Sequence, residues 1–295
     1  MMLFAGFETH RVEGEGATIH LRRGGNGPPL LLLHGYPQTG AMWHAMAADL
    51  ARDYTLIIPD LRGYGDSDRP ATDPAHRTYS KRAVAADMVT VMRRLGYDRF
   101  MAAGHDRGGR VLHRMCLDHP QAVTHAAVLD IVPTATVFEA TNQTLATGYF
   151  HWFFLIQPGG LPERMIGHEP SLFLRSCLAG WSRGRLDFFD ERALAEYERC
   201  FADPQVIHAT CEDYRAGATI DLVDDREDGL SRITCPLLVL WGRHGLMHRH
   251  FDVLQCWRDK VSGTVSGSPV DAGHFLCEEA PETAVDRFRA FFPSA

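Results

Sequence analysis

The chain has 295 residues and a formal net charge of −7, with 45% hydrophobic and 23% charged residues. This is the composition of a globular protein, and it excludes a disordered chain, a collagen-like fibre and a small disulfide-stabilised scaffold. An acidic protein binds phosphate backbones poorly, so we expect no nucleic-acid partner. No apolar run is long enough to span a membrane and the first residues lack the basic start of a signal peptide, so we expect no membrane partner.

The seven cysteines are widely spaced, and no two of them form a C-x-x-C motif. This spacing favours neither a zinc site nor a redox dithiol. We therefore predict free, mostly buried thiols, a cytoplasmic location and no metal site.

Short apolar runs alternate with segments of helical periodicity in the first half of the chain. The runs predict buried parallel strands at 30–33, 55–58, 100–103 and 126–129. The segments between them predict helices at 41–51, 81–95 and 109–118. The pattern returns late in the chain with strands at 236–241 and near 263–270 and a helix at 282–292. This order predicts an α/β fold, with a mostly parallel sheet flanked by helices.

The alternation stops after Pro133, where about ninety residues are rich in aromatic, Glu and Arg side chains and show no clear strand. We interpret residues 134–228 as a helical cap inserted into a core domain. That core would consist of residues 1–133 and 229–295.

A strand-to-helix junction with the sequence Gly104-His-Asp106-Arg-Gly108 is the most informative motif. Hydrolases place their nucleophile on a sharp turn of the form G-x-S-x-G, and here Asp106 occupies the nucleophile position. Glycines suit this turn because a Cβ at either position would collide with the neighbouring strand and helix. The alternative is a Gly-rich loop whose Asp caps the following helix.

Other motifs follow the predicted strands. The loop His34-Gly-Tyr36-Pro follows the first of them, where hydrolases of this kind supply a backbone N–H to an oxyanion hole. The second N–H would come from the residue after the nucleophile, Arg107. The Gly-interrupted loop from Asp60 to Ser67 is interpreted as a structural turn.

The base and the acid of a catalytic triad are also predicted. His274 follows the last strand, in the order nucleophile, acid, base that this fold uses. The strand PLLVLWG is followed by no carboxylate, so Asp130, at the end of an earlier strand, is the candidate acid. Its alternative role is to cap the following segment.

Together these residues resemble the fluoroacetate (haloacetate) dehalogenases of the α/β-hydrolase superfamily. The resemblance extends from HGYPQT through DLRGYGDS, GHDRGGR and HWFF to DAGHF, and GHDRGGR combined with HWFF is its specific part. It implies the α/β-hydrolase fold with an inserted helical cap, catalysis by Asp106, Asp130 and His274, and a homodimer. It also implies that Arg107 and Arg110 bind the substrate carboxylate. One departure is Gly109, where the family often has Ala.

Elementary chemistry agrees with a halo-acid substrate. An ionised Asp can attack an sp³ carbon without a general base, whereas a Ser must first lose its proton. The carboxylate of a halo acid would repel Asp106 unless cations neutralise it, and arginines bind carboxylates bidentately. The alternative for Arg107 and Arg110 is surface salt bridging. His274, oriented by Asp130, would activate the water that cleaves the resulting ester.

The resemblance further implies a halide pocket formed by His151, Trp152 and a cap tyrosine that we assign to Tyr214. His and Trp N–H groups are hydrogen-bond donors that a leaving halide needs. The alternative is that this aromatic run packs the cap onto the core. Tyr36, Trp181 and His105 are further candidates for the pocket, and the sequence does not place them.

The expected activity is hydrolysis of a haloacetate to glycolate and halide, with no cofactor. An epoxide hydrolase using the same Asp106, with cap tyrosines such as Tyr149 and Tyr214 as acids, is the alternative. Arg107 argues against it, because epoxide hydrolases usually carry Trp at that position. A non-catalytic binding protein is disfavoured because all three triad positions are filled. The sequence leaves open which halide is preferred and how large a substrate is accepted.

Overall fold

The computed structural model describes residues 3–294, so residues 1, 2 and 295 of the predicted core lie outside the described part. Within it, eight strands form one sheet in the order β1-β2-β4-β3-β5-β6-β7-β8. The strands are β1 (Glu8–Glu13), β2 (Thr18–Gly24), β3 (Pro29–Leu33), β4 (Thr55–Pro59), β5 (Phe100–His105), β6 (Val123–Leu129), β7 (Leu237–Gly242) and β8 (Val265–Val270). The six strands from β4 to β8 in this order are parallel, whereas β1 and β2 are antiparallel to their neighbours.

The predicted strands are all present, and β5 and β6 extend the predicted runs by two or three residues. The residues of β3, β4, β5 and β7 are nearly all buried because helices cover both faces of the sheet, which is why they form continuous apolar runs. In β8, at the edge of the sheet, only Val270 is buried. β1 and β2 were not predicted. Ile19 and Leu21 of β2 are fully buried and alternate with polar residues, so the strand has a period of two and contains no continuous apolar run.

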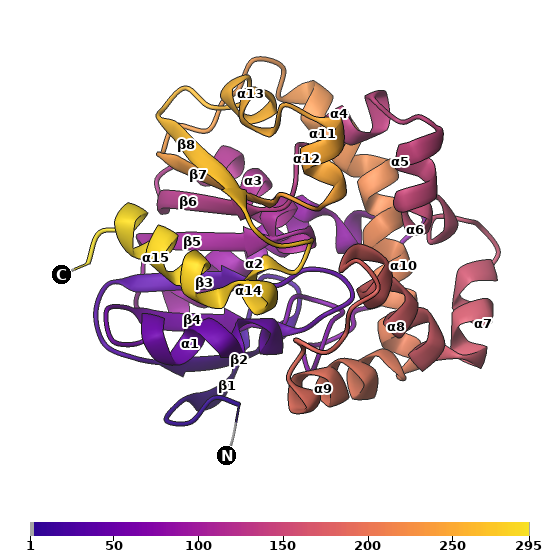
Figure 1. Ribbon diagram of the computed structural model, residues 1–295, viewed down its shortest axis with the longest axis horizontal. Coiled ribbons are helices and arrows are strands. Elements are labelled where there is room, and N and C mark those ends of the chain that lie inside the picture. Colours follow the sequence, from indigo (N-terminus) through magenta and orange to yellow (C-terminus); the bar gives the residue numbers. More distant parts are fainter. Residues whose placement is uncertain (1–2, 295) are drawn as a thin grey trace.

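Helices of the sheet domain flank this sheet on both sides (Figure 1). They are η1 (Gly40–Trp43), α1 (His44–Leu50), η2 (Arg77–Tyr79), α2 (Lys81–Arg94), α3 (Arg107–Asp118), α12 (Leu246–His250), α13 (Val253–Arg258), α14 (Leu276–Glu279) and α15 (Pro281–Phe291). α1 packs against α15 on one face, and α2 packs against α3 on the other. The segment predicted as one helix at 41–51 is a 3₁₀ turn followed by α1, and α3 begins two residues earlier than predicted.

The segment between β6 and β7 is helical throughout its regular structure, as predicted. It contains α4 (Thr134–Glu139), α5 (Gln143–Gly148), α6 (Phe150–Phe154), α7 (Leu161–His168), α8 (Pro170–Trp181), α9 (Glu191–Phe201), α10 (Pro204–Ala218) and α11 (Ile220–Glu227). These helices gather beside one end of the sheet (Figure 1). That end is where β5 stops, since Arg107, two residues beyond β5, contacts Asp213 of α10. No helix within residues 3–294 is both long enough and apolar enough to cross a membrane.

Candidate active site

Asp106 sits on a sharp turn between β5 and α3, and its backbone is held in an unusual conformation. Its φ of 44° and ψ of −113° lie outside the regions that an Asp ordinarily adopts. The flanking glycines make the turn possible. A Cβ on Gly104 would lie 2.4 Å from the carbonyl oxygen of Gly108, and one on Gly108 would lie 2.5 Å from that of Leu33. The turn therefore projects Asp106 beyond the edge of the sheet, at the start of α3.

The loop after β3 reaches the Asp106 carboxylate. The backbone N–H of Tyr36 donates a hydrogen bond to Oδ2 of Asp106 over 3.0 Å. Gly35 allows this approach, since a Cβ there would lie 2.6 Å from Cβ of Asp106. The sequence predicts this N–H as one oxyanion donor, and in the structure it donates to the Asp106 carboxylate. The loop from Asp60 is structural as interpreted, because the Asp60 carboxylate accepts from the N–H groups of Gly40 and Asp66.

His274 and Asp130 form a buried pair beside Asp106. Nδ1 of His274 lies 2.6 Å from Oδ2 of Asp130, while Oδ1 of Asp130 accepts from the N–H of Gly242 over 2.9 Å. Asp130 follows β6, and the backbone N–H that binds its carboxylate belongs to Gly242, the last residue of β7. Burial lowers the pKa of His274, but the hydrogen bond and charge of Asp130 outweigh it, and the net shift is upward. This arrangement favours a proton on Nδ1 and leaves Nε2 to act as a base.

His105 supports this pair from within the protein rather than lining a pocket. Its ring lies 4.5 Å from that of His274, centroid to centroid, and its Nε2 is 2.9 Å from the backbone oxygen of His274. Burial lowers the pKa of His105 to about 3, so the ring is neutral near pH 7. A neutral imidazole with its proton on Nε2 donates to that carbonyl and fixes the loop after β8.

Both arginines of the GHDRGGR motif are buried, which excludes surface salt bridging for either of them. Arg107 is held by Asp213: its Nε donates to Oδ2 over 2.7 Å, and its Nη2 donates to the backbone oxygen over 2.7 Å. Lys81 and the hydroxyl of Tyr64 also contact the Asp213 carboxylate. Asp213 was not predicted: in the sequence it is one of two adjacent acids, Glu212 and Asp213, next to Tyr214, and its burial on α10 is known only from the structure.

Arg110, in contrast, has no carboxylate partner among the ion pairs of the described residues. Its Nη1 donates to the backbone oxygen of Val132 and to Oγ1 of Thr134, and its guanidinium lies 4.6 Å above the ring of Trp152. Its Nε is buried and makes no hydrogen bond. Burial lowers the pKa of Arg110, and the nearby charge of Asp106 opposes that shift. The result is a buried cation beside Asp106 with an unused donor.

Three aromatic side chains around Asp106 also carry buried polar atoms without partners. These atoms are the Tyr36 hydroxyl, Nδ1 of His151 and the Tyr214 hydroxyl. The rings touch one another, with centroids 5.2 Å apart for Tyr36 and Tyr214, 5.9 Å for Tyr36 and His151, and 5.4 Å for His151 and Tyr214. We call Tyr36, Arg110, His151 and Tyr214 the buried polar cluster. Buried polar groups are normally paired, so four unpaired ones together indicate a place for a polar ligand.

The predicted site residues come from six separate segments of the chain, and the structure brings these segments together around Asp106. Trp152 is 2% exposed and stacks on Tyr149, with ring centroids 6.1 Å apart. Trp181 lies against His151 and against His274, at centroid distances of 4.4 and 5.6 Å. Of the three residues that the sequence left unplaced, Tyr36 and Trp181 therefore belong to the surroundings of Asp106.

Comparison with known proteins agrees with this geometry. The family model described as "alpha/beta hydrolase fold" matches residues 28–281. The chain belongs to the α/β-hydrolase fold family. A curated member, fluoroacetate dehalogenase from Burkholderia sp, is 44% identical, and the match covers 99% of this chain and 96% of that protein. A soluble epoxide hydrolase from Corynebacterium sp. (strain C12) is 31% identical over 96% of each chain.

Among solved structures, this α/β hydrolase is similar to a candidate alpha/beta hydrolase from Nostoc sp PCC 7120. The two chains are 53% identical and superpose with a TM-score of 0.96, over 98% of this chain and 99% of the other. The fold predicted from the sequence is confirmed by this match and by the family model.

The Asp213 carboxylate pairs with two buried cations, so its replacement by an uncharged side chain of the same shape tests how much this charge contributes to stability. Asp213→Asn keeps the size of the side chain but leaves the buried Arg107 and Lys81 without its charge. Removing one partner of a buried ion pair costs about 3–5 kcal/mol, so we expect urea unfolding to show a loss of roughly 3 kcal/mol. The matched control is Asp66→Asn, which removes an exposed partner of Arg199 and should cost below about 1 kcal/mol. Equal small losses in both variants would contradict a structural role for Asp213.

Proposed function

We propose that this α/β hydrolase is a hydrolytic dehalogenase that converts a haloacetate, fluoroacetate in particular, to glycolate and halide through an ester on Asp106. The observation that carries the proposal is Arg110. It is a buried cation with a free donor and no carboxylate partner among the described residues, next to the nucleophile. A substrate carboxylate would supply the missing charge. The 44% identity to a fluoroacetate dehalogenase across nearly the whole chain supports the same assignment.

The first step is displacement of the halide. Burial raises the pKa of Asp106, but His274 and Arg110 lower it more strongly, so the net shift is downward and the carboxylate is ionised near pH 7. We propose that Arg110 and Arg107 hold the substrate carboxylate. The contacts of Arg107 with Asp213 use Nε and Nη2, so Nη1 is the group assigned to the substrate. One carboxylate oxygen of Asp106 then forms a bond to the carbon as the carbon–halogen bond breaks and the halide leaves with the electron pair.

The second step is hydrolysis of the ester. His274 takes a proton from water through Nε2, and the hydroxide attacks the carbonyl carbon of the Asp106 ester. The N–H groups of Tyr36 and Arg107 are assigned to the oxyanion that forms. Its collapse breaks the bond between the carbonyl carbon and the glycolate oxygen, and this oxygen takes the proton from His274. Asp106 then carries one oxygen from water and loses the second proton of that water to solvent, which restores the carboxylate.

We assign the leaving halide to His151, Trp152 and Tyr214. Burial lowers the pKa of His151 to about 3, so its ring is neutral near pH 7 and still offers one N–H. Fluoride departs with a concentrated charge, and donors in a dry site stabilise that charge as it develops. The alternative activity, epoxide hydrolysis, would use the Tyr214 hydroxyl as an acid and would leave Arg110 without a ligand.

The function is tested by halide release from fluoroacetate and chloroacetate, with styrene oxide as the control substrate. We expect halide release from the acids and little turnover of the epoxide. The reverse result would assign the protein to the epoxide hydrolases.

The nucleophile is tested with His274→Asn, which removes the base of the second step only. Incubation with chloroacetate should leave an ester on Asp106, detected as a mass increase on its peptide. In the parent enzyme, a single turnover in ¹⁸O-water should give unlabelled glycolate hydroxyl, because that oxygen comes from Asp106. Labelled product in the first turnover would show direct attack by water.

The carboxylate contact is tested with Arg110→Gln. Loss of a charge-assisted hydrogen bond in a buried site costs roughly 2–5 kcal/mol. We therefore expect kcat/KM for chloroacetate to fall about 30-fold or more. Chloroacetamide, which lacks the charge, serves as the matched control: its slow turnover should change little. A parallel fall for acid and amide would remove Arg110 from carboxylate binding.

The halide assignment is tested with Tyr214→Phe. The hydroxyl has no partner in the structure, so its removal should cost little stability, and the melting temperature should stay the same or rise. Turnover of fluoroacetate should nevertheless fall by ~10²-fold, the scale of losing one donor to a developing anion, and chloroacetate should be affected less. An equal fall for both halides would return Tyr214 to a packing role.

We further propose that residues 134–228 act as a cap over Asp106, that the protein works in the cytoplasm, and that it forms a homodimer. All seven cysteines are free thiols, which supports a reducing compartment. Within residues 3–294, four of the five exposed large hydrophobic side chains lie on α6, α7 and α8 and support a dimer surface there: Phe150, Leu161, Met165 and Leu172.

The dimer surface is tested by placing a charge in it. Leu172 is 63% exposed, and Leu172→Glu should shift sedimentation velocity from dimer toward monomer. Leu230→Glu is the matched control, since Leu230 is 89% exposed and lies outside these helices. A parent protein that sediments as a monomer would exclude the dimer.

A further inference from the structure

The buried polar cluster is closed to solvent, so a ligand has to pass between side chains to reach it. Arg110 and His151 are each 3% exposed, and Asp106 is 7% exposed. A cavity of about 170 Å³ borders the site on the His274 side. We call it the His274 cavity; the following residues line it: Asp130, Gly148, Tyr149, Gly180, Trp181, Arg183, His244, Gly245, Leu246, Arg249 and His274.

Two side chains separate this cavity from the cluster. Trp181 and Tyr149 both line the cavity, and both also touch His151, at centroid distances of 4.4 and 5.4 Å. The two rings are themselves 6.3 Å apart. Asp106, Arg110 and Tyr214 do not line the cavity. A ligand in it would therefore lie one layer of aromatic rings away from the cluster.

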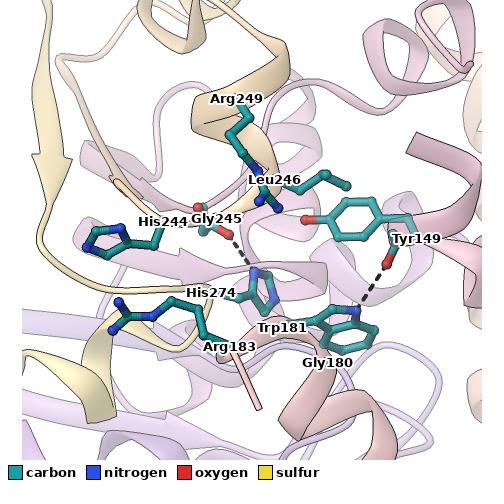
Figure 2. A pocket seen from close by; sticks show the side chains of 11 residues that line it. Tyr149, Gly180, Trp181, Arg183, His244, Gly245, Leu246, Arg249 and His274 are labelled. Carbon is teal, nitrogen blue, oxygen red and sulfur yellow. Dashed lines mark hydrogen bonds and ion pairs between the residues drawn. The ribbon is translucent and has the colours of Figure 1, made fainter. Parts of the chain in front are cut away.

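The charged side chains around the cavity are mainly cationic. Arg183 and Arg249 are exposed, and neither takes part in an ion pair or a hydrogen bond among those found in residues 3–294. In Figure 2, Arg249 reaches from α12 toward Tyr149 and His274, while Arg183 lies on the other side of His274, beside His244. The one carboxylate in the lining, Asp130, is bonded to His274, and nearby Asp271 is bonded to His244.

Arg183 is also held in an unusual backbone conformation. Its φ is 60°, in the left-handed region that non-glycine residues seldom adopt, although a glycine, Gly184, comes next. This conformation closes the end of α8, where the N–H of Gly184 donates to the backbone oxygen of Ala179 over 2.8 Å. The turn places the Arg183 guanidinium beside the cavity, opposite Arg249.

We propose that the His274 cavity is a second anion site, which holds a small carboxylate between solvent and the buried polar cluster. This proposal builds on the proposed function and names the route its substrate takes. A protein of net charge −7 repels an anionic substrate overall, and a local pair of cations reverses that effect at the opening. From this site the halo acid passes Trp181 and Tyr149 to reach Arg110.

The test follows association of acetate, an unreactive carboxylate, by stopped-flow tryptophan fluorescence. At low ionic strength the association rate constant should fall about tenfold in Arg183→Gln/Arg249→Gln, the lower end of electrostatic steering effects. In about 0.5 M salt the difference should shrink to roughly twofold, because salt screens exposed charges. Arg243→Gln is the matched control: it removes an exposed arginine of the same segment that does not line the cavity.

An unchanged rate in the double variant, or an equal fall in Arg243→Gln, would overturn the proposal. A second measurement uses crystals soaked in bromide. The parent should show an anomalous peak in the cavity between the two guanidinium groups, and the double variant should lack it; a parent without the peak would also overturn the proposal. Neither measurement requires turnover, so failure of the proposed function would appear separately, as absence of halide release by the parent.

Discussion

The site depends on keeping Asp106 ionised where water is nearly excluded. Burial alone would raise the pKa of this carboxyl, and His274 and Arg110 reverse the shift. The first turn of α3 achieves this geometrically, since Arg110 is the next residue on the same face of the helix. Arg107 lowers the pKa of Asp106 less than Arg110 does, because the positive charge of Arg107 is paired with Asp213. The uncompensated cation is therefore Arg110, and in the proposed reaction the charge that keeps Asp106 ionised also binds the carboxylate of the substrate.

The same electrostatics order the two steps. Asp106 helps to raise the pKa of His274, so before the reaction its charge opposes the loss of a proton from this imidazole. In the proposed reaction, ester formation removes that charge and lowers the proton affinity of His274. His274 would then be available as a base when the ester is present to be hydrolysed. Asp130, held by the N–H of Gly242, maintains the orientation of the ring throughout.

The sequence predicted the parts of the molecule that rest on local rules. Buried parallel strands gave continuous apolar runs, and the elbow at Asp106 required glycines at fixed positions. β1 and β2 were not predicted because β2 alternates apolar and polar residues and β1 has Val12 as its single apolar residue, so neither forms such a run. Asp213 could not be found, since its partners Arg107 and Lys81 lie more than a hundred residues away and only folding brings them together. For the same reason the unpaired atoms of Tyr36 and His151 have no signal in the sequence.

The positions of these residues divide the chemistry between two parts of the chain. In the proposed mechanism, the ends of β5 and β6 and the loop after β8 supply the nucleophile, the acid and the base, a set that serves attack on either a haloacetate or an epoxide. The groups proposed to bind the substrate come from both parts of the chain. Arg110 belongs to the sheet domain, whereas His151 and Tyr214 belong to the inserted helices. On the proposed mechanism, a relative could keep the ester chemistry and differ in the groups around the substrate. This is in keeping with the matches of a fluoroacetate dehalogenase and of an epoxide hydrolase to nearly the whole of this chain. The discriminating feature is then the unpaired charge of Arg110, which has no use with a neutral substrate.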